Sequence, residues 1–432
     1  MKLWKNWAGN QRARPYSWLK PRTTEEVAIA VKSARAQGRK VKVIGSGHSF
    51  TSAAVANDVL VDMSLISSCG SVDLATGTVE VGGGTTLAEL NLLLHSQGRA
   101  LANLGDIAYQ TISGAISTST HGTGATLTGM AAQVVGLTLV DGHGEVRRLR
   151  VDDAQDELFS SAQVGVGALG AITSVELTTV PRFALEAVET PMRLKDVLAN
   201  LDEHVASNDH FEFFWIPHTG WALTKRNNRT DAPLAPMPKM REWYQKSLLE
   251  NTAFGAVCQV GKIAPQFVPR LAKALPASGT TRYVDESYRV FSSARRVKFV
   301  EMEYAIPREA CTEVLGRITK MIDQRGFKIG FPVEVRFTAA DTIPLSTSSE
   351  RDSAYIAVHM FKGVDYTSYF NAVADIMAEY AGRPHWGKMH FLASDELEAL
   401  YPKWQTFQSA KRILDPEGTF ENEYSRKIFG AL

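Results

Sequence analysis

Four glycine-rich segments in the first 182 residues constrain the fold more than any other feature of the chain. They read IGSGHSF (44–50), VGGGTTL (81–87), GDIAYQTISGAISTSTHGTG (105–124) and GVGALGAIT (165–173). Glycine turns after strands let backbone N–H groups approach an anion closely. The third segment has Gly, Ser or Thr at 11 of its 20 positions, which suits a stretch lying flat against a large polar ligand. These segments therefore predict, in the first half of the chain, an unusual glycine-lined site for a large, phosphate-bearing molecule.

Two common nucleotide-binding folds do not fit these segments. No Walker-type lysine follows any of the four loops, which disfavours a P-loop nucleotidase. No GxGxxG opens a helix within a compact βαβ unit, which disfavours a Rossmann dinucleotide site.

The pattern of elements predicts two α+β domains. Residues 23–37 have a threonine cap and an apolar stripe typical of a helix, and residues 134–149 form a hairpin turning at 141–144. After Pro181 the chain alternates long aromatic strands with amphipathic helices, which favours an antiparallel sheet with helices on one face. We expect one domain at 1–182, completed by 418–432, and a second at 183–417. The polar, proline-bearing stretch 226–246 is predicted to be a long loop and a possible lid.

Composition narrows the class of protein. A chain of 432 residues is long enough for two domains, and a net charge of +1 gives no reason to expect a nucleic-acid or anionic-membrane partner. Three scattered cysteines offer neither a disulfide framework nor metal-ligand spacing, so no metal is expected and a reducing compartment fits. No apolar run is long enough to cross a bilayer, and the expected location is the cytoplasm, with peripheral attachment left open.

Several of these motifs resemble a known family. IGSGHSF, VGGGTTLAEL, NLGDIAYQTISGAISTSTHGTG and GALGAITSVELT resemble the PCMH-type FAD-binding domain of the vanillyl-alcohol-oxidase-like flavoproteins. EMEYAIPRE, VEVRF and RPHWGK resemble the C-terminal domain of the aldonolactone oxidases. That group includes L-gulono-1,4-lactone oxidases and dehydrogenases, D-arabinono-1,4-lactone oxidases and alditol oxidases. The resemblance runs nearly end to end and implies a two-domain flavoprotein with an N-terminal FAD-binding domain and a C-terminal substrate, or cap, domain.

The resemblance implies which residues bind FAD. His48 stands where many members carry a histidine bonded covalently to the 8α-methyl group of FAD, and imidazole is a suitable nucleophile near neutral pH. Some members bind FAD without that bond, and a histidine that only hydrogen-bonds in the turn is the alternative. The implied FAD-binding residues are Ser46, Gly47, His48, Ser49, Phe50, Gly105, Asp106, Thr111, Gly114, Ala115, Ser117, Thr118, His121 and Ile172.

The catalytic residues are expected in the second half. Glu334 and Arg336 alternate on a predicted strand at 332–338 and therefore share one face. Alone, such a pair is often a surface salt bridge, but the resemblance assigns Glu-x-Arg to substrate binding. His359 on another strand and Lys388 in HWGK complete the implied catalytic set, although each alone also fits a structural role. His385 and His390 are expected to be structural.

Oxidation of a CH–OH carbon by hydride transfer to flavin N5 suggests a role for each member of the set. Arg336 and Lys388 would stabilise the negative charge of the reduced flavin and grip the sugar oxygens. Glu334 or His359 would accept the hydroxyl proton, and the sequence does not choose between them.

Two further positions bear on the reaction. Asp106 stands where alditol oxidases carry a serine, so Asp106, Glu334, Arg336 and Lys388 are expected to bind an aldono-1,4-lactone such as L-gulono-1,4-lactone, whose oxidation product tautomerises to ascorbate. The alternative is an alditol oxidase acting on xylitol- or sorbitol-type polyols.

Gly105 stands where an alanine restricts oxygen access in the family, which favours O2 as acceptor and H2O2 as product over another acceptor. A flavin oxidase of another substrate and a non-catalytic flavin-binding protein are the remaining readings.

Overall fold

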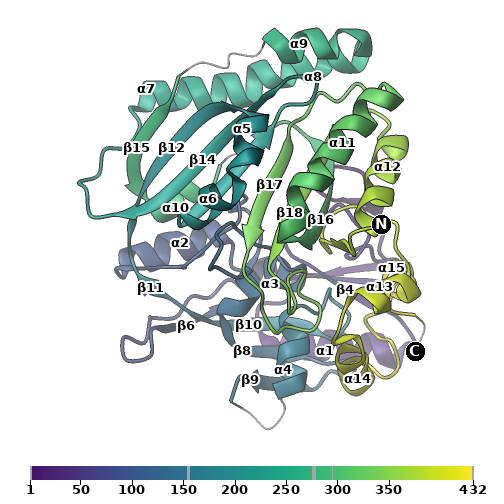
Figure 1. Cartoon of the computed structure of the whole chain (residues 1–432). Coiled ribbons are helices and arrows are strands. Elements are labelled where there is room, and N and C mark those ends of the chain that lie inside the picture. The colour runs from purple at the N-terminus through teal and green to yellow at the C-terminus, as the bar shows by residue number, and fades with distance from the viewer. Residues whose placement is uncertain (1, 153–155, 275–278, 294, 431–432) are drawn as a thin grey trace.

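The computed structural model describes residues 2–152, 156–274, 279–293 and 295–430. Figure 1 shows two α+β domains stacked on each other, the lower one built from both ends of the chain and the upper one from its middle. The predicted α+β class and two-domain architecture are confirmed.

The first domain contains a small parallel sheet that positions the first glycine loop. Its strands, in the order β3–β5–β4, are β3 (Ser17–Leu19), β4 (Val41–Ile44) and β5 (Val59–Asp62). Helix α1 (Thr24–Ala36) begins at Thr23, whose side chain accepts a hydrogen bond from the Glu26 N–H, as the threonine cap predicts. The helix packs Val27 and Val31 against this sheet. The loop with His48 leaves directly from the carboxyl end of β4.

A second, antiparallel sheet in this domain connects the other glycine loops. Its order is β6–β10–β8–β9, and the β8–β9 hairpin turns where predicted. Its elements are β6 (Thr78–Gly82), α2 (Leu87–Ser96), α3 (Ile112–Ser117), β8 (Val134–Val140), β9 (Val146–Arg150), α4 (Asp156–Gln163) and β10 (Ala171–Thr178). Smaller elements are β1 (Trp4–Lys5), β2 (Arg12–Ala13), η1 (Met63–Leu65), β7 (Arg99–Ala100), η2 (Met130–Gln133) and β11 (Val180–Pro181).

The second domain is built on an eight-stranded sheet in which every strand pair is antiparallel. Its order is β15–β12–β14–β13–β17–β18–β16–β19. The strands are β12 (Ala184–Arg193), β13 (His210–Trp215), β14 (Trp221–Thr230), β15 (Thr281–Glu286), β16 (Phe299–Pro307), β17 (Val333–Thr338), β18 (Ser353–Phe361) and β19 (Arg383–Pro384).

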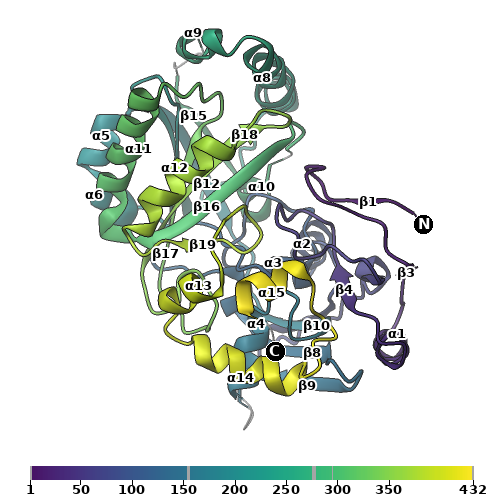
Figure 2. The same cartoon turned by 90° about the vertical axis from the view of Figure 1, so that its right-hand side faces the viewer.

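Helices cover one face of this sheet and leave the other face toward the first domain (Figure 2). They are α5 (Leu194–Ala199), α6 (Leu201–Ala206), α11 (Cys311–Arg325) and α12 (Thr367–Ala378), with α10 (Ser287–Phe291) and η5 (Arg308–Ala310) at its margins. Asn200 lies between the short helices α5 and α6. The covered face buries the apolar alternate residues of β17, so the polar alternate residues point toward the first domain.

The prediction of a long loop and lid at 226–246 is wrong. Strand β14 continues through Thr230, because its residues pair with β12 along the whole strand. After a short loop the chain enters a helical run of α7 (Lys239–Glu242), the π-helical η3 (Trp243–Ala253), α8 (Phe254–Ile263), η4 (Pro265–Phe267) and α9 (Val268–Ala274). These helices lie at the end of the second domain farthest from the first (Figures 1 and 2). In the described ranges, none of the helices is both long and apolar enough to traverse a bilayer.

The chain returns to the first domain earlier than residue 418. Helices α13 (Ser394–Leu400) and α14 (Trp404–Leu414) already place Leu397, Trp404 and Phe407 in the hydrophobic core of the first domain, before α15 (Glu423–Phe429) completes it. We therefore propose that the closing segment begins near Ser394. Residues 431 and 432 of the predicted segment lie outside the described residues.

A buried ion pair fixes this closing segment and gives a test. Lys411 donates to Glu421 at 2.8 Å, and both side chains are buried. Lys411→Met leaves the Glu421 carboxylate buried without that cation, and we expect a loss of about 3 kcal/mol of unfolding free energy, since breaking a buried pair exposes the full desolvation cost. Thermal and urea unfolding would measure the loss. Arg35→Met, which breaks the exposed Arg35–Glu417 pair on the same segment, serves as the control and is expected to match the parent. Equal stability of all three proteins would contradict the assignment.

Candidate active site

Three of the four glycine segments, 44–50, 105–124 and 165–173, line one cleft of the first domain. Nine of the predicted FAD-binding residues line it: Ser46, Gly47, His48, Ser49, Thr111, Gly114, Ser117, Thr118 and Ile172. Backbone geometry explains the sequence there. Gly47 has a φ of +68°, a left-handed conformation, and a Cβ at Gly45 would collide with the Thr111 hydroxyl. The Thr111 side chain caps α3 by accepting from the Gly114 N–H. The loop after β4 can therefore approach the start of α3 this closely only because residue 45 is a glycine.

The lining of the cleft fits FAD. One part offers the hydroxyls and backbone of 46–49 and 111–118, and another offers small and apolar residues at 166–172. A long ligand with a charged centre and two aromatic ends matches that division. His48 adds a specific feature, because its Nδ1 is buried and has no hydrogen-bond partner among the described residues. Burial, reinforced by the positive charge of Lys388, lowers the pKa of His48 to about 4, so the imidazole is neutral near pH 7.

The N-terminal segment, to which the sequence assigned no function, supports the His48 loop. The Asn6 side chain donates to the Ser49 carbonyl at 2.9 Å, and the Trp7 N–H donates to the Gly47 carbonyl at 2.8 Å. The Trp7 indole stacks on the His48 ring with centroids 5.7 Å apart. The position of the imidazole is therefore fixed from two sides.

The other predicted FAD-binding residues lie beside the cleft rather than on its lining. Phe50 stacks on Phe299 of β16 in the core of the second domain, and Ala115 is fully buried in the first. Gly105 lies against the Thr120 methyl group and the His121 backbone, at 3.1 and 3.2 Å from the position of an added Cβ. These three positions shape the surroundings of the cleft, and Asp106 and His121 belong to the ionic groups described below.

Glu334 and Arg336 project together from β17, as the alternation predicts. Their side chains form an ion pair at 2.6 Å, and the Arg336 Nε donates to Glu212 of the neighbouring β13 at 2.7 Å. Burial alone would lower the pKa of Arg336, but Glu334 and Glu212 raise it above its usual range. Burial raises the pKa of Glu334, although Arg336 opposes the rise. The guanidinium is thus a permanent cation held between two carboxylates.

A second ionic group brings His359 and Lys388 together through Glu301. Glu301 on β16 lies directly opposite His359 on β18, and one carboxylate oxygen lies 3.5 Å from the His359 Nε2. The other oxygen forms a salt bridge with Lys388. Burial would raise the pKa of Glu301, but Lys388 and His359 lower it to about 2. Lys388 reaches this position because its loop is anchored on the first domain, where the Phe50 N–H donates to the Gly387 carbonyl at 2.7 Å.

A third buried group lies one pleat further along β16. Glu303 faces His121, with Oε1 and Nε2 3.3 Å apart, and the candidate ligand atoms of His121, Glu303 and His385 all lie within 4.8 Å of one another. Their other contacts tie them to the fold, since His121 Nδ1 hydrogen-bonds the Gly122 carbonyl and the Gly387 N–H donates to His385 Nδ1. Burial lowers the pKa of His385 to about 3. The group joins the third glycine segment to the HWGK loop, and it gives His121 and His385 structural contacts.

Asp106 lies at a small cavity between the domains that Arg336 also lines. Its two oxygens accept from the Ser293 hydroxyl at 2.7 Å and the Arg295 guanidinium at 2.8 Å. Burial would raise the pKa of Asp106, but Arg295, Arg336 and Lys225 lower it to about 2. Asp106 is therefore ionised and held in place beside Arg336.

Sequence reasoning missed the carboxylates that hold the predicted cations. Glu212 lies in the aromatic strand FEFFWI (211–216), and Glu301 and Glu303 lie in FVEMEYAI (299–306), which overlaps the motif EMEYAIPRE, but no role of its own was predicted for any of the three. A signal was present, because a strand that is apolar on both sides of a charged residue rarely buries that residue without a partner. Ser293 and Arg295 gave no such signal.

The fold and the site together define a class. A glycine-rich FAD cleft faces a wall of paired carboxylates and cations from a separate antiparallel domain, as expected of a two-domain FAD-dependent oxidoreductase. Comparison with known proteins gives the family. The sequence profile described as FAD binding domain matches residues 16–150, and that described as D-arabinono-1,4-lactone oxidase matches residues 175–428. The chain belongs to this aldonolactone oxidase family of flavoenzymes.

Individual relatives agree with that placement. The chain is 41% identical to L-gulono-1,4-lactone dehydrogenase of Mycobacterium tuberculosis, over 99% of each chain. It is 32% identical to L-gulonolactone oxidase of Bos taurus, over 98% of this chain and 97% of that one. Among solved structures, a solvent-stable cholesterol oxidase superposes with a TM-score of 0.83 over 99% of this chain and 97% of its own, at 17% identity. That likeness supports the fold alone.

Two buried histidines predict how stability depends on pH. Burial lowers the pKa of His385 and of His390 to about 3, against about 6.5 in an unfolded chain. Below pH 6.5 the unfolded state therefore binds protons that the folded state does not, so we expect the unfolding free energy to fall as the pH drops from about 6.5 toward 4. His390→Gln should make this dependence shallower by about one proton, or about 1.4 kcal/mol per pH unit.

Urea titrations between pH 7 and 4.5 would measure that slope. Tyr424→Phe provides the matched control, because Tyr424 is the hydrogen-bond partner of His390 at 2.7 Å and the variant keeps the titrating ring. This control is expected to lower stability but retain the parental slope. A His390→Gln protein with the parental slope would contradict the assignment.

Proposed function

We propose that the protein uses FAD to oxidise a CH–OH group of an aldono-1,4-lactone such as L-gulono-1,4-lactone. The observation that carries this proposal is the placement of Arg336, a cation fixed by Glu334 and Glu212, at the cavity that also contains ionised Asp106. A small, neutral, hydroxyl-rich molecule is recognised by such charged donors and acceptors. The names of the relatives support the substrate class.

FAD, when bound, supplies the two-electron oxidising chemistry. Lys388 holds positive charge near His48 of the cleft, and Arg336 holds it at the cavity between the domains; a preorganised cation lowers the energy of negative charge that develops beside it. Glu301 and Glu212 keep those cations in place, since each accepts from one of them within the buried wall. Both act as positioning residues.

Glu334 is the better candidate for accepting the hydroxyl proton. Both ring nitrogens of His359 are engaged, Nδ1 with the Pro332 carbonyl at 3.1 Å and Nε2 with Glu301. Glu334 contacts Arg336 through Oε1, and burial raises the pKa of its carboxyl although Arg336 opposes the rise, a direction that favours a proton acceptor. We assign His359 to orienting Glu301 and through it Lys388.

Covalent attachment of FAD through His48 also forms part of the proposal. Its support is a neutral imidazole with a buried, unpartnered Nδ1 at the cleft, held by Trp7 and the Gly47 turn. For the acceptor we propose O2, with H2O2 as product, because Gly105 leaves no side chain between Thr120 and the adjoining backbone.

A substrate panel tests the reaction. The flavin-loaded enzyme, assayed in air, is expected to turn over L-gulono-1,4-lactone and related lactones faster than xylitol or sorbitol, with one H2O2 per turnover. Arg336→Lys should lower kcat/KM by roughly a hundredfold, because a lysine ammonium lacks the planar guanidinium geometry that donates to two carboxylates at once.

The control for this substitution is Arg317→Lys. It alters the exposed ion pair between Arg317 on α11 and Glu379 at the end of α12, and the variant is expected to retain the parental kinetics. Faster turnover of polyols would favour the alditol alternative, and oxidation without H2O2 would show that another acceptor is used. An Arg336→Lys enzyme with full activity would contradict the site.

Acid precipitation tests the attachment. The parent protein is expected to give a yellow pellet and a colourless supernatant, because the flavin stays bound to the chain. His48→Ala should release all flavin into the supernatant while still taking up FAD in the folded state. A parent pellet without colour would show that attachment is not covalent.

A further inference from the structure

Exposed apolar side chains concentrate on the helices at the far end of the second domain. Among the described residues, eighteen large hydrophobic side chains are exposed, and seven of them fall between residues 234 and 267. They are Leu234, Met240, Trp243, Tyr244, Val260, Ile263 and Phe267, with Met240 82% and Ile263 77% exposed. Such a concentration on a short segment marks an interaction surface rather than scattered surface hydrophobes.

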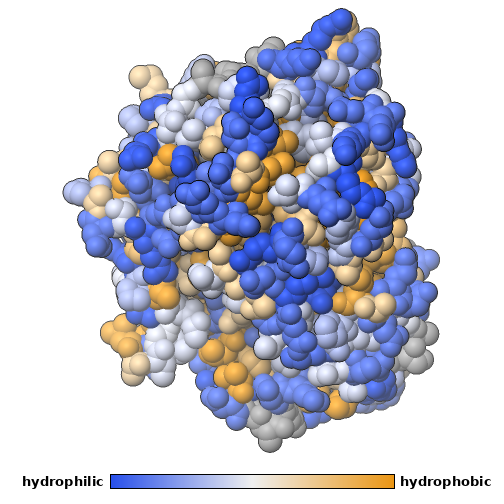
Figure 3. All heavy atoms as spheres, in the orientation of Figure 1, coloured by the Kyte–Doolittle hydropathy of each residue, from blue (hydrophilic) through white to orange (hydrophobic). Residues whose placement is uncertain are grey.

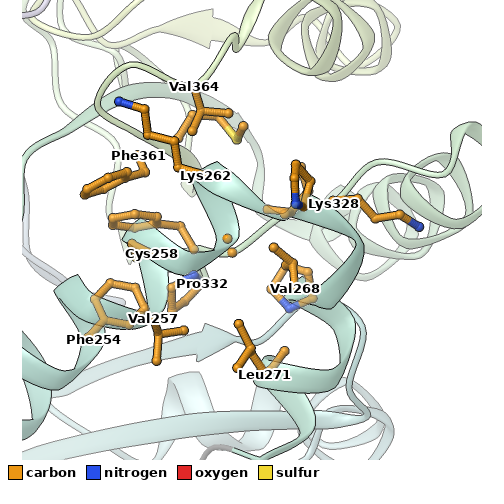
Figure 4. Close-up of a pocket in the computed structure, with 18 of the residues that line it drawn as sticks. Phe254, Val257, Cys258, Lys262, Val268, Leu271, Lys328, Pro332, Phe361 and Val364 are labelled. Atoms are coloured by element: carbon orange, nitrogen blue, oxygen red, sulfur yellow. The ribbon is translucent and has the colours of Figure 1, made fainter.

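Helix α8 has apolar side chains on both of its sides. Its inner residues Phe254, Val257 and Cys258 face an apolar cavity of about 70 Å³ together with Val268 and Leu271 of α9 (Figure 4). Its outer residues Val260 and Ile263 face solvent. A surface helix of a globular protein normally has a polar outer face. On α8 the exposed side combines Val260 and Ile263 with the polar Gln259 and Lys262, so apolar and basic side chains face solvent together.

The exposed apolar residues follow one another along a continuous helical run. Helices α7, η3 and α8 succeed each other without a break from Lys239 to Ile263. Met240, Trp243 and Tyr244 are exposed near the start of this run, and Val260 and Ile263 are exposed near its end.

Charge distinguishes the class of partner. Residues 239–273 contain six Lys or Arg and two Asp or Glu, a net charge of +4, whereas the whole chain carries +1 and the remainder therefore −3. The whole-chain charge gave no reason to expect an anionic partner, but its distribution does. Exposed Lys239, Arg241, Lys262 and Lys273 flank the apolar side chains. Aromatic and aliphatic side chains bordered by basic ones are typical of segments that lie in the surface of an anionic bilayer.

We propose that residues 239–273 bind the surface of anionic phospholipid bilayers. Met240, Val260, Ile263 and Phe267 enter the boundary between headgroups and acyl chains, Trp243 and Tyr244 lie at headgroup level, and the basic residues contact lipid phosphates. Helices α7, α8 and α9 lie at the end of the second domain farthest from the first domain (Figure 1), which contains the residues that line the cleft, and Figure 3 shows polar and apolar residues side by side on the surface in the same view. The inference is independent of the substrate.

Vesicle sedimentation of the flavin-loaded full chain tests the proposal. We expect the protein to sediment with vesicles of phosphatidylcholine and phosphatidylserine, to bind phosphatidylcholine vesicles weakly, and to be released by salt. Ile263→Asp combined with Phe267→Asp should weaken binding roughly tenfold, and Lys262→Glu with Lys273→Glu should weaken it and flatten its salt dependence. Leu74→Asp, at a side chain 78% exposed in the first domain, is the matched control and should bind like the parent.

Bound flavin and the melting temperature verify that each variant is folded, and the salt titration of the parent needs no variant. A parent protein that stays in the supernatant with anionic vesicles would overturn the proposal, as would an Ile263→Asp/Phe267→Asp protein that binds like the parent. The parent protein could instead form a dimer through this face without binding vesicles, and the Ile263→Asp/Phe267→Asp variant would then be monomeric. That result would show that a second copy of the chain covers the face, and it would also overturn the proposal.

Discussion

The structure depends on the pairing of charges buried on one face of β13, β16, β17 and β18. Glu212, Glu301, Glu303 and Glu334 all point from adjacent strands toward the first domain. An isolated buried carboxylate costs several kcal/mol, so each requires a cation or proton donor within reach. Arg336 satisfies two of them from within the sheet, whereas Lys388 and His121 arrive from loops held by the first domain. Glu301 and Glu303 therefore gain these partners only when the sheet packs on the FAD-binding domain, and the proposed catalytic residues come together at that contact.

The same constraint explains why the site combines rigid and close-packed parts. The glycine loops bring backbone against backbone at positions where a Cβ would collide, as at Gly45 against Thr111, and the N-terminal segment fixes the His48 loop from outside. At Gly387, where the two domains meet, an added Cβ would be in tight contact, 3.3 Å from the Ser49 hydroxyl and 3.4 Å from the Thr118 hydroxyl. The HWGK loop thus contacts the first domain through small residues.

The sequence predicted those parts of the fold and site that depend on local pattern. The threonine cap of α1, the β8–β9 hairpin and the shared face of Glu334 and Arg336 follow from spacings of two to four residues. The register between strands that are distant in the sequence does not follow from such local spacings. Nothing near Glu301 in the chain indicates that it lies opposite His359, or that Glu212 lies beside Arg336, because strand order sets those contacts. The loop predicted at 226–246 failed for the same reason, since pairing with β12 overrode polar residues that locally favour a turn.

Lys388 interacts with Glu301 of the second domain and also affects His48 of the first domain. It pairs with Glu301 in the wall, and its charge adds to burial in lowering the pKa of His48 in the cleft. A neutral imidazole retains a lone pair, whereas a protonated one has none, so the charge of Lys388 favours the form of His48 that the proposed covalent attachment requires. Lys388 is held near both partners by the hydrogen bond from the Phe50 N–H to the Gly387 carbonyl, two residues after His48. The proposed attachment therefore depends in part on docking of the second domain, because a displaced HWGK loop would remove the Lys388 charge from Glu301 and from the surroundings of His48.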